Sequence, residues 1–492
     1  MNRLFLLALT FVAIFKTLGI AADTTHLSAK NVHQKYQAFK AELGPQSNEE
    51  FIQSVQKSVP GFFVRYPETL EERWRLGQIP EPFSQSPIVP PSPVIYWDTY
   101  DDDTPEYQAQ VVIDELIRRD LDSHFIKAIL YKESNDVVNN LARLNNLQQL
   151  HLVSANVDVE GLKHLSEMPA LSYFHFATEK LSVPEVEQIA RSKTIRELRM
   201  SIPLGSETPA TELLRPLQKM TNLRTLCIPG GDLDEEALQV IAGIPFLESL
   251  EIENVIIPRD GLNHLARMRF LRHFSSKRLR TIREEVMSDT YRFNRVEGGY
   301  PDDIECVDYS PLKRIPTLKS LTLSQNLRSD QIRKYGLSEL TQLQEICNCP
   351  RLDHPLVFEL NKLPKLETIR FSGNKRHYKS LEFSQQLPGL KKMEIGWVSI
   401  PDAELAQYLA YLPEHQQLQE LQINSLWVSY QPSPGGEQIP SYVSVDTLKP
   451  LSEIPELRIL RFNPTGISTE QAAFFDGINR DDHPVRILKL ER

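Results

Sequence analysis

The feature that most constrains the fold of this chain is a pattern that it repeats. The segment EGLKHLSEMPALSYFHF at Glu160 returns as DGLNHLARMRFLRHF at Asp260, with glycine, leucine and methionine in matching places. A frame of three apolar positions, L-x-x-L-x-L, recurs at steps of mostly 23 to 25 residues, sometimes 28. Its copies begin at Leu147, Leu171, Ile195, Leu223, Leu247, Leu271, Leu318, Leu343, Leu366, Leu390, Leu418, Leu457 and Val485, and a weaker first copy begins at Ile126, with core positions Ile129 and Tyr131. This periodicity predicts a stack of similar units that share a continuous core.

Each copy is predicted to contain one strand and one short helix. Within x-L-x-L-x the leucines alternate with the x residues, so the two sets face opposite sides of a strand. About a dozen residues later, apolar residues three or four apart indicate a helix, as at Leu162, Leu165 and Met168. Ser182 and Glu185 have the spacing of a capping box, and prolines two residues before several frame leucines stop the helix.

The frame and its period resemble those of leucine-rich-repeat proteins, from about residue 121 to the end of the sequence. The resemblance implies an α/β solenoid with a parallel sheet on its concave face and short helices on its convex face. Members of this family mostly mediate protein–protein contacts. The copies lean toward the x-x-G-L-x-x-L variety of bacterial repeats. We expect equivalent buried positions on parallel strands for Leu150, Leu250, Leu321 and Leu421.

The beginning of the sequence has the layout of a secretory signal peptide: Arg3, an apolar run from Leu4 to Phe15, and the small residues Ala21 and Ala22. We therefore expect an exported protein, secreted or periplasmic, with no stable membrane insertion after cleavage. The predicted organisation is a signal peptide at 1–22, a helical N-terminal region at 23–78, a proline-rich linker at 79–103, a cap helix at 104–125 and the repeat domain at 126–492, with irregular insertions at 277–310 and 429–446.

Two stretches interrupt the frame. The first runs from residue 272 to 317 and is either one degenerate repeat, with TYRF at Thr290 as its strand, or a long loop. The second contains YQPSPGGEQIPS, which has the composition of a loop. Either insertion is a partner-contacting segment or a tolerated surface loop.

Composition narrows the classes of function. The chain is 41% hydrophobic and 24% charged, which is typical of a folded soluble protein, and its net charge of −10 disfavours a nucleic-acid partner. No phosphate-binding loop, nucleophile elbow or zinc-protease motif is present, and no cofactor is predicted. The sequence therefore favours a non-catalytic scaffold that binds a protein or peptide. The alternatives are an enzyme with its chemistry in the N-terminal region or at 272–317, and adhesion to glycan or cell-wall material.

The x residues of the strands are predicted to form the binding surface. They mix both signs of charge with amides and one large aromatic residue, which suits a folded protein or peptide better than nucleic acid or lipid. The predicted partner-binding residues are His151, Tyr173, His175, Arg199, Glu251, Arg370, Glu394 and Arg461. His151 and His175 fall side by side; they are either part of a polar surface or two of the ligands that a metal needs.

Three further groups have more than one interpretation. Cys227, Cys347 and Cys349 are predicted on the outward strand face, as packed thiols, with a disulfide to Cys306 or metal or redox work as alternatives, and Asn348 stands where a core leucine belongs. The acids 101–103 either bind calcium or complement a helix N-terminus. The basic residues between 267 and 283 are either a surface for an anionic partner or a solvated loop.

The last strand is predicted in HPVRILKLER, with Ile487, Lys489 and Glu491 outward and Leu488 and Leu490 inward. Its exposed edge is protected only by charged residues.

Overall fold

The structure, a computed structural model, describes residues 51–53, 55, 62–65, 94–98, 106–119, 127–131, 135–154, 157–178, 180–203, 208–276, 279–282, 307–323, 335–349, 354–371, 384–395, 402–423, 427–432, 438–462, 469–478 and 486–489. The chain forms two compact units. Unit 1 comprises Met1–Glu68, Glu72–Thr208 and Lys219–Leu223, and unit 2 comprises Thr69–Glu71, Pro209–Gln218 and Arg224–Arg492.

Unit 1 contains a sheet whose strands follow one another in chain order. They are β1 (Phe62–Arg65), β2 (Val94–Asp98), β3 (Lys127–Tyr131), β4 (Gln149–Val153), β5 (Tyr173–Ala177) and β6 (Glu197–Met200). β1 pairs with β2 in the antiparallel sense, and every pair from β2 to β6 is parallel. The stretches predicted as a helical region and a linker thus each supply one strand.

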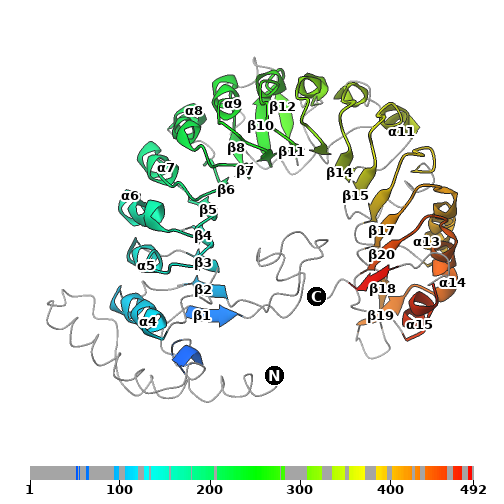
Figure 1. Ribbon diagram of the computed structural model, residues 1–492, viewed down its shortest axis with the longest axis horizontal. Coiled ribbons are helices and arrows are strands. Elements are labelled where there is room, and N and C mark those ends of the chain that lie inside the picture. Colours follow the sequence, from blue (N-terminus) through cyan, green and yellow to red (C-terminus); the bar gives the residue numbers. More distant parts are fainter. Residues whose placement is uncertain are drawn as a thin grey trace. The chain divides into compact units, whose positions relative to one another are not determined.

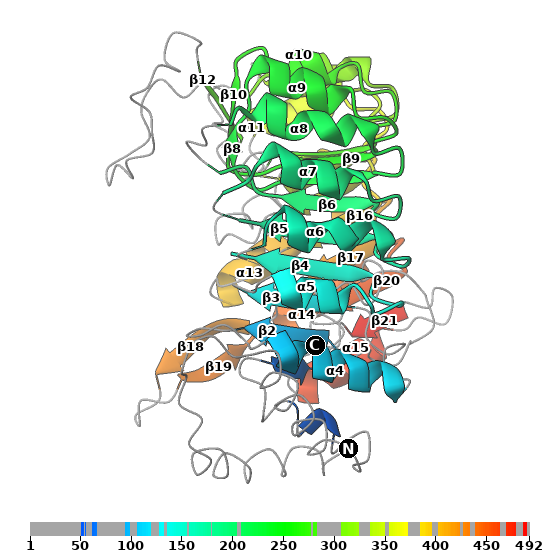
Figure 2. The ribbon, with the colours of Figure 1, turned by 90° about the vertical axis from the view of Figure 1, so that its left-hand side faces the viewer.

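The helices of unit 1 lie along one side of this sheet (Figure 1). They are α4 (Glu106–Arg118), α5 (Asn135–Leu141), α6 (Val159–Leu162), the 3-10 helix η3 (Lys163–Glu167) and α7 (Val183–Ala190). Figure 2 shows α5, α6 and α7 stacked in chain order, and each contacts the next. We call the opposite side of the parallel strands, which faces away from the helices, the sheet face.

Unit 2 repeats the same arrangement. Its parallel strands are β7 (Thr225–Ile228), β9 (Ser249–Ile252), β11 (His273–Ser275), β13 (Ser320–Thr322), β14 (Glu345–Cys349), β15 (Thr368–Phe371), β16 (Lys392–Ile395), β17 (Glu420–Ile423), β20 (Ile459–Phe462) and β21 (Arg486–Lys489). Its helices are α8 (Ala210–Leu214), η4 (Arg215–Lys219), α9 (Glu235–Ala242), α10 (Leu262–Leu265), η6 (Ser310–Arg314), η8 (Leu337–Glu339), α11 (His354–Leu360), α13 (Asp402–Leu409), η10 (Leu412–Glu414), α14 (Val445–Leu448), η11 (Lys449–Glu453) and α15 (Thr469–Gly477).

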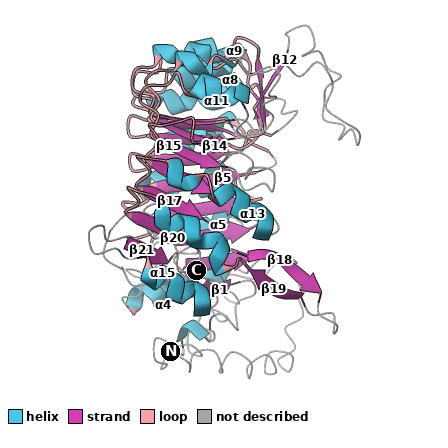
Figure 3. Cartoon of the chain, turned by 90° about the vertical axis from the view of Figure 1, so that its right-hand side faces the viewer, coloured by secondary structure: helices cyan, strands magenta, loops and turns pink. Residues whose placement is uncertain are grey.

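Two smaller sheets accompany the parallel strands of unit 2. β8 (Gly231–Asp232), β10 (Val255–Pro258) and β12 (Arg280–Ile282) form a three-stranded parallel sheet. β18 (Trp427–Pro432) and β19 (Gln438–Tyr442) form an antiparallel hairpin within the second predicted insertion (Figure 3).

The apolar frame forms the core of both units. The predicted positions Leu150, Leu250, Leu321 and Leu421 are fully buried, and each lies in register with a frame residue of the next strand. Along β4, β5, β9, β15 and β16 buried residues alternate with partly exposed ones, as expected when one strand face packs on helices. The predicted α/β fold with a parallel sheet and helices on one side is confirmed.

The first copy of the frame was placed wrongly by one residue. In β3, Ala128 pairs with Leu150 and Leu130 with Leu152, so Ala128 and Leu130 occupy the core positions. Both are fully buried, whereas Tyr131 is 36% exposed. Because side chains alternate along a strand, Lys127, Ile129 and Tyr131 belong to the sheet face. The frame was misplaced because Ala128, and not a larger apolar residue, occupies a core position.

The first insertion is not a repeat with a strand of its own in the parallel sheet. β11 pairs directly with β13, in register from His273 with Ser320 to Ser275 with Thr322. Of the residues between them, Arg280–Ile282 form β12, which joins the separate three-stranded sheet. The TYRF segment lies outside the described residues.

Two further registers differ from the prediction. In β14 the pairing with β15 shifts between Ile346 and Cys349, and Cys349 pairs with Phe371, a buried core residue. The expected irregularity at Asn348 is thus a bulge, and it moves Cys349 from the predicted outward register to the core register. In β21, Ile487 pairs with Leu460, so the core register falls on Ile487 and not on Leu488.

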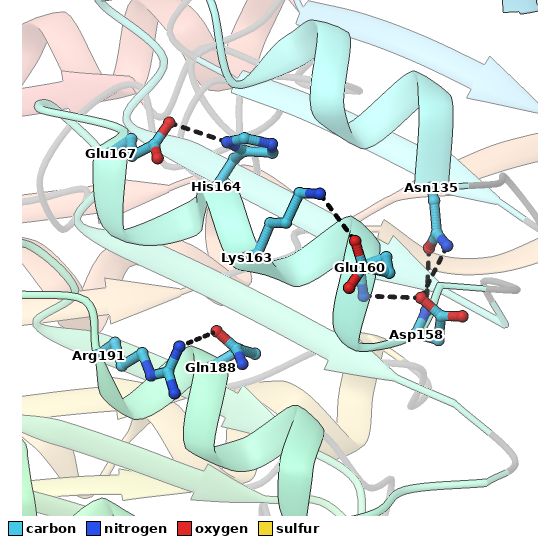
Figure 4. A network of polar contacts seen from close by, with 8 residues as sticks. All are labelled: Asn135, Asp158, Glu160, Lys163, His164, Glu167, Gln188 and Arg191. Atoms are coloured by element: carbon cyan, nitrogen blue, oxygen red, sulfur yellow. Dashed lines mark hydrogen bonds and ion pairs between the residues drawn. The ribbon is translucent and has the colours of Figure 1, made fainter.

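Polar contacts on the helix side are local and fasten neighbouring repeats (Figure 4). Asp158 caps α6 by accepting a hydrogen bond from the Glu160 backbone N–H at 2.8 Å, and it accepts another from Asn135 Nδ2 of the preceding repeat at 2.7 Å. The predicted capping box at Ser182 and Glu185 is present at the start of α7. These contacts satisfy helix-end groups that have no partner within the helix.

Several predictions fall outside the described residues: the signal peptide at 1–22, the acids at 101–103, Cys306 and most of the first insertion. Among the residues that are described, no helix is both long enough and apolar enough to cross a membrane.

Candidate functional site

The sheet face of unit 1 brings together side chains from four neighbouring strands. One row follows the register Lys127, Gln149, Tyr173 and Glu197, and the next follows Ile129, His151, His175 and Arg199. Neighbouring strands lie about 4.8 Å apart, so each residue is in reach of its neighbours within a row. We call Lys127, His151, Tyr173, His175 and Arg199 the basic cluster.

His151 is the centre of the basic cluster. Its ring stacks on the Tyr173 ring with centroids 4.8 Å apart and meets the His175 ring edge-on at 5.4 Å. The two Nδ1 atoms lie 3.4 Å apart, a distance at which one imidazole donates to the other. Nε2 of His151 is buried and has no hydrogen-bond partner in the described part of the chain. A buried polar atom without a partner is uncommon in folded proteins.

Both histidines are held neutral. Burial lowers the pKa of His151 to about 2, with further lowering by Lys127, His175 and Arg199. Burial likewise lowers the pKa of His175 to about 4, helped by Arg199 and Lys127. Every charged group that acts on the two rings is basic, so the electrostatic potential around them is positive.

Lys127 lies at the end of this cluster and was missed by the sequence prediction. The residue is 2% exposed, and among the described residues it forms no ion pair or hydrogen bond. Burial lowers its pKa to about 8. A buried ammonium without a partner is costly, because the lost hydration is not replaced. The signal that would have found it is the frame F-x-x-A-x-L at Phe125, which puts Lys127 on the sheet face.

The sheet face of unit 2 has a different character, because charged residues on β14, β15, β16, β17 and β20 form ion pairs with one another. Arg370 Nε donates to Glu345 Oε1 at 2.7 Å, and its Nη1 lies 3.5 Å from Glu394 Oε2. Glu420 Oε1 lies 2.9 Å from Lys392 Nζ and 3.0 Å from Arg461 Nε. These side chains form ladders of ion pairs across adjacent strands.

The predicted partner-binding residues thus fall into separate groups. His151, Tyr173, His175 and Arg199 gather in unit 1, Arg370 and Glu394 pair with each other, and Arg461 pairs with Glu420. Glu251 lies on β9 between Cys227 and Ser275. Arg461 is 7% exposed, so little of it is available to a partner. The binding role of all eight residues remains a prediction.

The surroundings of Cys227 and Cys347 on the sheet face of unit 2 do not favour metal binding or redox reactions. Cys227 and Cys347 are reduced cysteines outside any disulfide, and Cys227 is 5% exposed. Burial, reinforced by Glu345, raises the pKa of Cys347 to about 12, which keeps it protonated and a poor nucleophile. No cluster of three or more metal-ligand side chains occurs within the described ranges, and His151 with His175 supplies only two imidazoles.

The period of strand, turn, short helix and turn, with core leucines in register on parallel strands, defines a leucine-rich-repeat protein. No protein-family model matches the chain, and no curated protein matches its sequence.

Solved structures of similar fold include two internalins and a receptor. An internalin from Listeria monocytogenes has a TM-score of 0.32 and 14% identity over 75% of this chain and 80% of that chain. Internalin C2 from the same organism has a TM-score of 0.27 and 18% identity over 43% of this chain and 74% of that chain. TLR13, solved as a complex with ssRNA13, has a TM-score of 0.35 and 14% identity over 69% of this chain and 47% of that chain. At such low scores these likenesses carry no evidence on function.

Proposed function

We propose that the chain is a non-catalytic scaffold that binds a protein or peptide partner through the sheet face of unit 1, centred on Tyr173 and Arg199. The observation that supports this most directly is the basic cluster, in which Nε2 of His151 is buried and has no hydrogen-bond partner within the described chain. An arginine beside an aromatic ring is a common energetic centre of protein interfaces. The paired face of unit 2 contributes less, because a partner would compete with existing ion pairs.

The first experiment asks which surface a partner touches. A photo-crosslinking amino acid replaces Tyr173 in the full chain, and a matched variant carries it at Glu187, an exposed residue on the helix side of the same repeat. The proposal expects a crosslinked partner from position 173 and none from position 187. Crosslinks from position 187 alone would place the interface on the helix side.

The second experiment measures affinity once that partner is purified. Tyr173→Ala and Arg199→Ala together should weaken binding at least tenfold, about 1.4 kcal/mol. The control is the pair Arg370→Ala and Glu394→Ala, which removes both members of an ion pair on unit 2 and should leave affinity unchanged. Unchanged affinity in the first double variant, with the melting temperature retained, would exclude the proposed face.

We also propose that the protein is exported, on the strength of the layout of residues 1–22. The mature protein should then begin near Ala22 or Asp23 and be found outside the cytoplasm. N-terminal sequencing that finds residues 1–20 on cytoplasmic protein would contradict export.

A further inference from the structure

We propose that the basic cluster of unit 1 is a binding site for an oxyanion, a carboxylate or a phosphate, with Lys127 and His151 as its main ligand-binding residues. The inference rests on the proposed function, because the oxyanion is taken to be a group that the partner presents to the sheet face.

The first argument is that two buried polar groups on adjacent strands lack partners. Nε2 of His151 on β4 is a buried atom without a hydrogen-bond partner, and Lys127 on β3 is 2% exposed, forms no ion pair with a described residue and has its ammonium desolvated by burial. Each group forfeits its hydration without a compensating hydrogen bond. An anionic ligand on the sheet face over β3 and β4 would supply acceptor oxygens to both groups.

The second argument is the sign of the charge. The groups that act electrostatically on His151 are Lys127, His175 and Arg199, and all of them are basic. The carboxylate nearest in register is Glu197, which is exposed on β6 and pairs in register with Tyr173. An anion that enters this partly water-excluded surface meets a positive potential from several directions.

The third argument is the hydrogen-bonding chemistry. Lys127 offers only donors, and so does Arg199. When Nδ1 of His151 accepts from His175, Nε2 of His151 carries its proton and becomes a third donor. Tyr173 covers one face of the His151 ring and fixes its orientation. Lys127 and Nε2 of His151 then both present donors, which match an oxyanion and mismatch a cation or a metal ion.

Binding should be coupled to protons. A bound anion stabilises the imidazolium forms of His151 and His175, so it raises the pKa of both rings. The other charged or titratable residues that the adjacent described strands present to them are Lys127 and Tyr131 on β3, Tyr173 on β5, and Glu197 and Arg199 on β6. Affinity is therefore expected to rise as the pH falls from 7 toward the range in which the histidines titrate.

The test titrates the full chain with inorganic phosphate and, separately, with acetate, at low ionic strength. Calorimetry measures the affinity, and NMR of the histidine ring protons measures the pKa of His151 and His175. The expected result is saturable binding of one or both anions with an upward shift of both histidine pKa values. Binding of phosphate alone identifies a phosphate-bearing ligand, and binding of acetate identifies a carboxylate.

Matched variants locate the site. Lys127→Met and His151→Phe should each weaken anion binding at least tenfold, and Phe preserves the stack on Tyr173. Lys392→Met, at the same position of a repeat in unit 2, should bind as the wild type does. Absence of saturable binding, or wild-type affinity in Lys127→Met, would overturn the oxyanion site. If crosslinking from position 173 persists in that case, the protein-binding proposal stands; if it is also absent, both fail.

Discussion

Lys127 in unit 1 and Lys392 in unit 2 occupy the same position of the repeat, the first residue of a strand on the sheet face. Lys392 finds Glu420 on the next strand, 2.9 Å away, and Glu420 also holds Arg461. Lys127 has Gln149 as its register neighbour on the next strand. Its ammonium forms no ion pair with a described residue. The same position of the repeat thus carries a lysine in an ion pair on the sheet face of unit 2 and a lysine without an ion pair among the described residues on that of unit 1. The apolar frame residues determine the architecture, and the x residues determine whether the side chains of the sheet face form ion pairs with one another.

The largest expected effect concerns what the two units share. Leu150→Ala in unit 1 and Leu421→Ala in unit 2 each remove a fully buried side chain at an equivalent register position. Each should lower the free energy of unfolding by about 2–5 kcal/mol, because the lost apolar contacts leave a cavity. Urea unfolding monitored by circular dichroism measures this. A negligible effect in one unit only would mean that the cores are not equivalent.

The next effect separates the two lysines. Lys127→Met removes a buried charge whose pKa is lowered to about 8 from an ordinary value near 10.5, so it should raise the free energy of unfolding at pH 7 by up to about 3 kcal/mol. The wild type should itself gain stability between pH 8 and 10.5, since only the unfolded chain then keeps the proton. Lys392→Met removes an ion pair and should cost up to about 1 kcal/mol. If both variants lower the free energy of unfolding, the two lysines do not differ in their contribution to stability and the prediction is wrong.

Acidification should weaken unit 1 more than unit 2. His151 and His175 have pKa values lowered to about 2 and 4, and in unit 2 burial lowers the pKa of His415, bonded to Ser384, to about 4. Below pH 6.5 these histidines become protonated in the unfolded chain but stay neutral in the folded chain. Stability should therefore fall by up to about 1.4 kcal/mol per pH unit for each histidine. Hydrogen exchange in β4 and β17 between pH 7 and 5 measures both units; equal losses would contradict the prediction.

The smallest effect is expected on the helix side, where the units should behave alike. Asp158 caps α6 in unit 1, and Asp234 caps α9 in unit 2 by accepting from Ala237 N–H at 2.7 Å. Alanine at either position should cost about 1 kcal/mol. Thermal unfolding of both variants checks this, and a clear difference between them would show that the contrast extends beyond the sheet face.

The repeat architecture was predictable because the frame leucines report a periodic core directly. Errors arose where the frame was weak. Ala128 at a core position shifted the first copy by one residue and removed Lys127 from the predicted surface. In β14 the bulge after Ile346 changed the register of Cys349.

The candidate site was harder to predict than the fold. The sequence placed His151, Tyr173, His175 and Arg199 on one face, since strand alternation suffices for that. The sequence could not show that Arg370 and Arg461 form ion pairs across the strands. Such a pair depends on the residue at the same position of the adjacent strand, which lies many residues away in the sequence.

The direct pairing of β11 with β13 has a consequence for how such a chain tolerates change. From His273 to Ser320 the sequence advances 47 residues, against 24 from Ser249 to His273, yet the ladder continues without a gap. Closing a flexible loop costs entropy that grows only with the logarithm of its length, so a doubling adds roughly 0.6 kcal/mol. A chain built in this way therefore accepts additional residues between two strands at little thermodynamic cost, and the pairing of the neighbouring strands is kept.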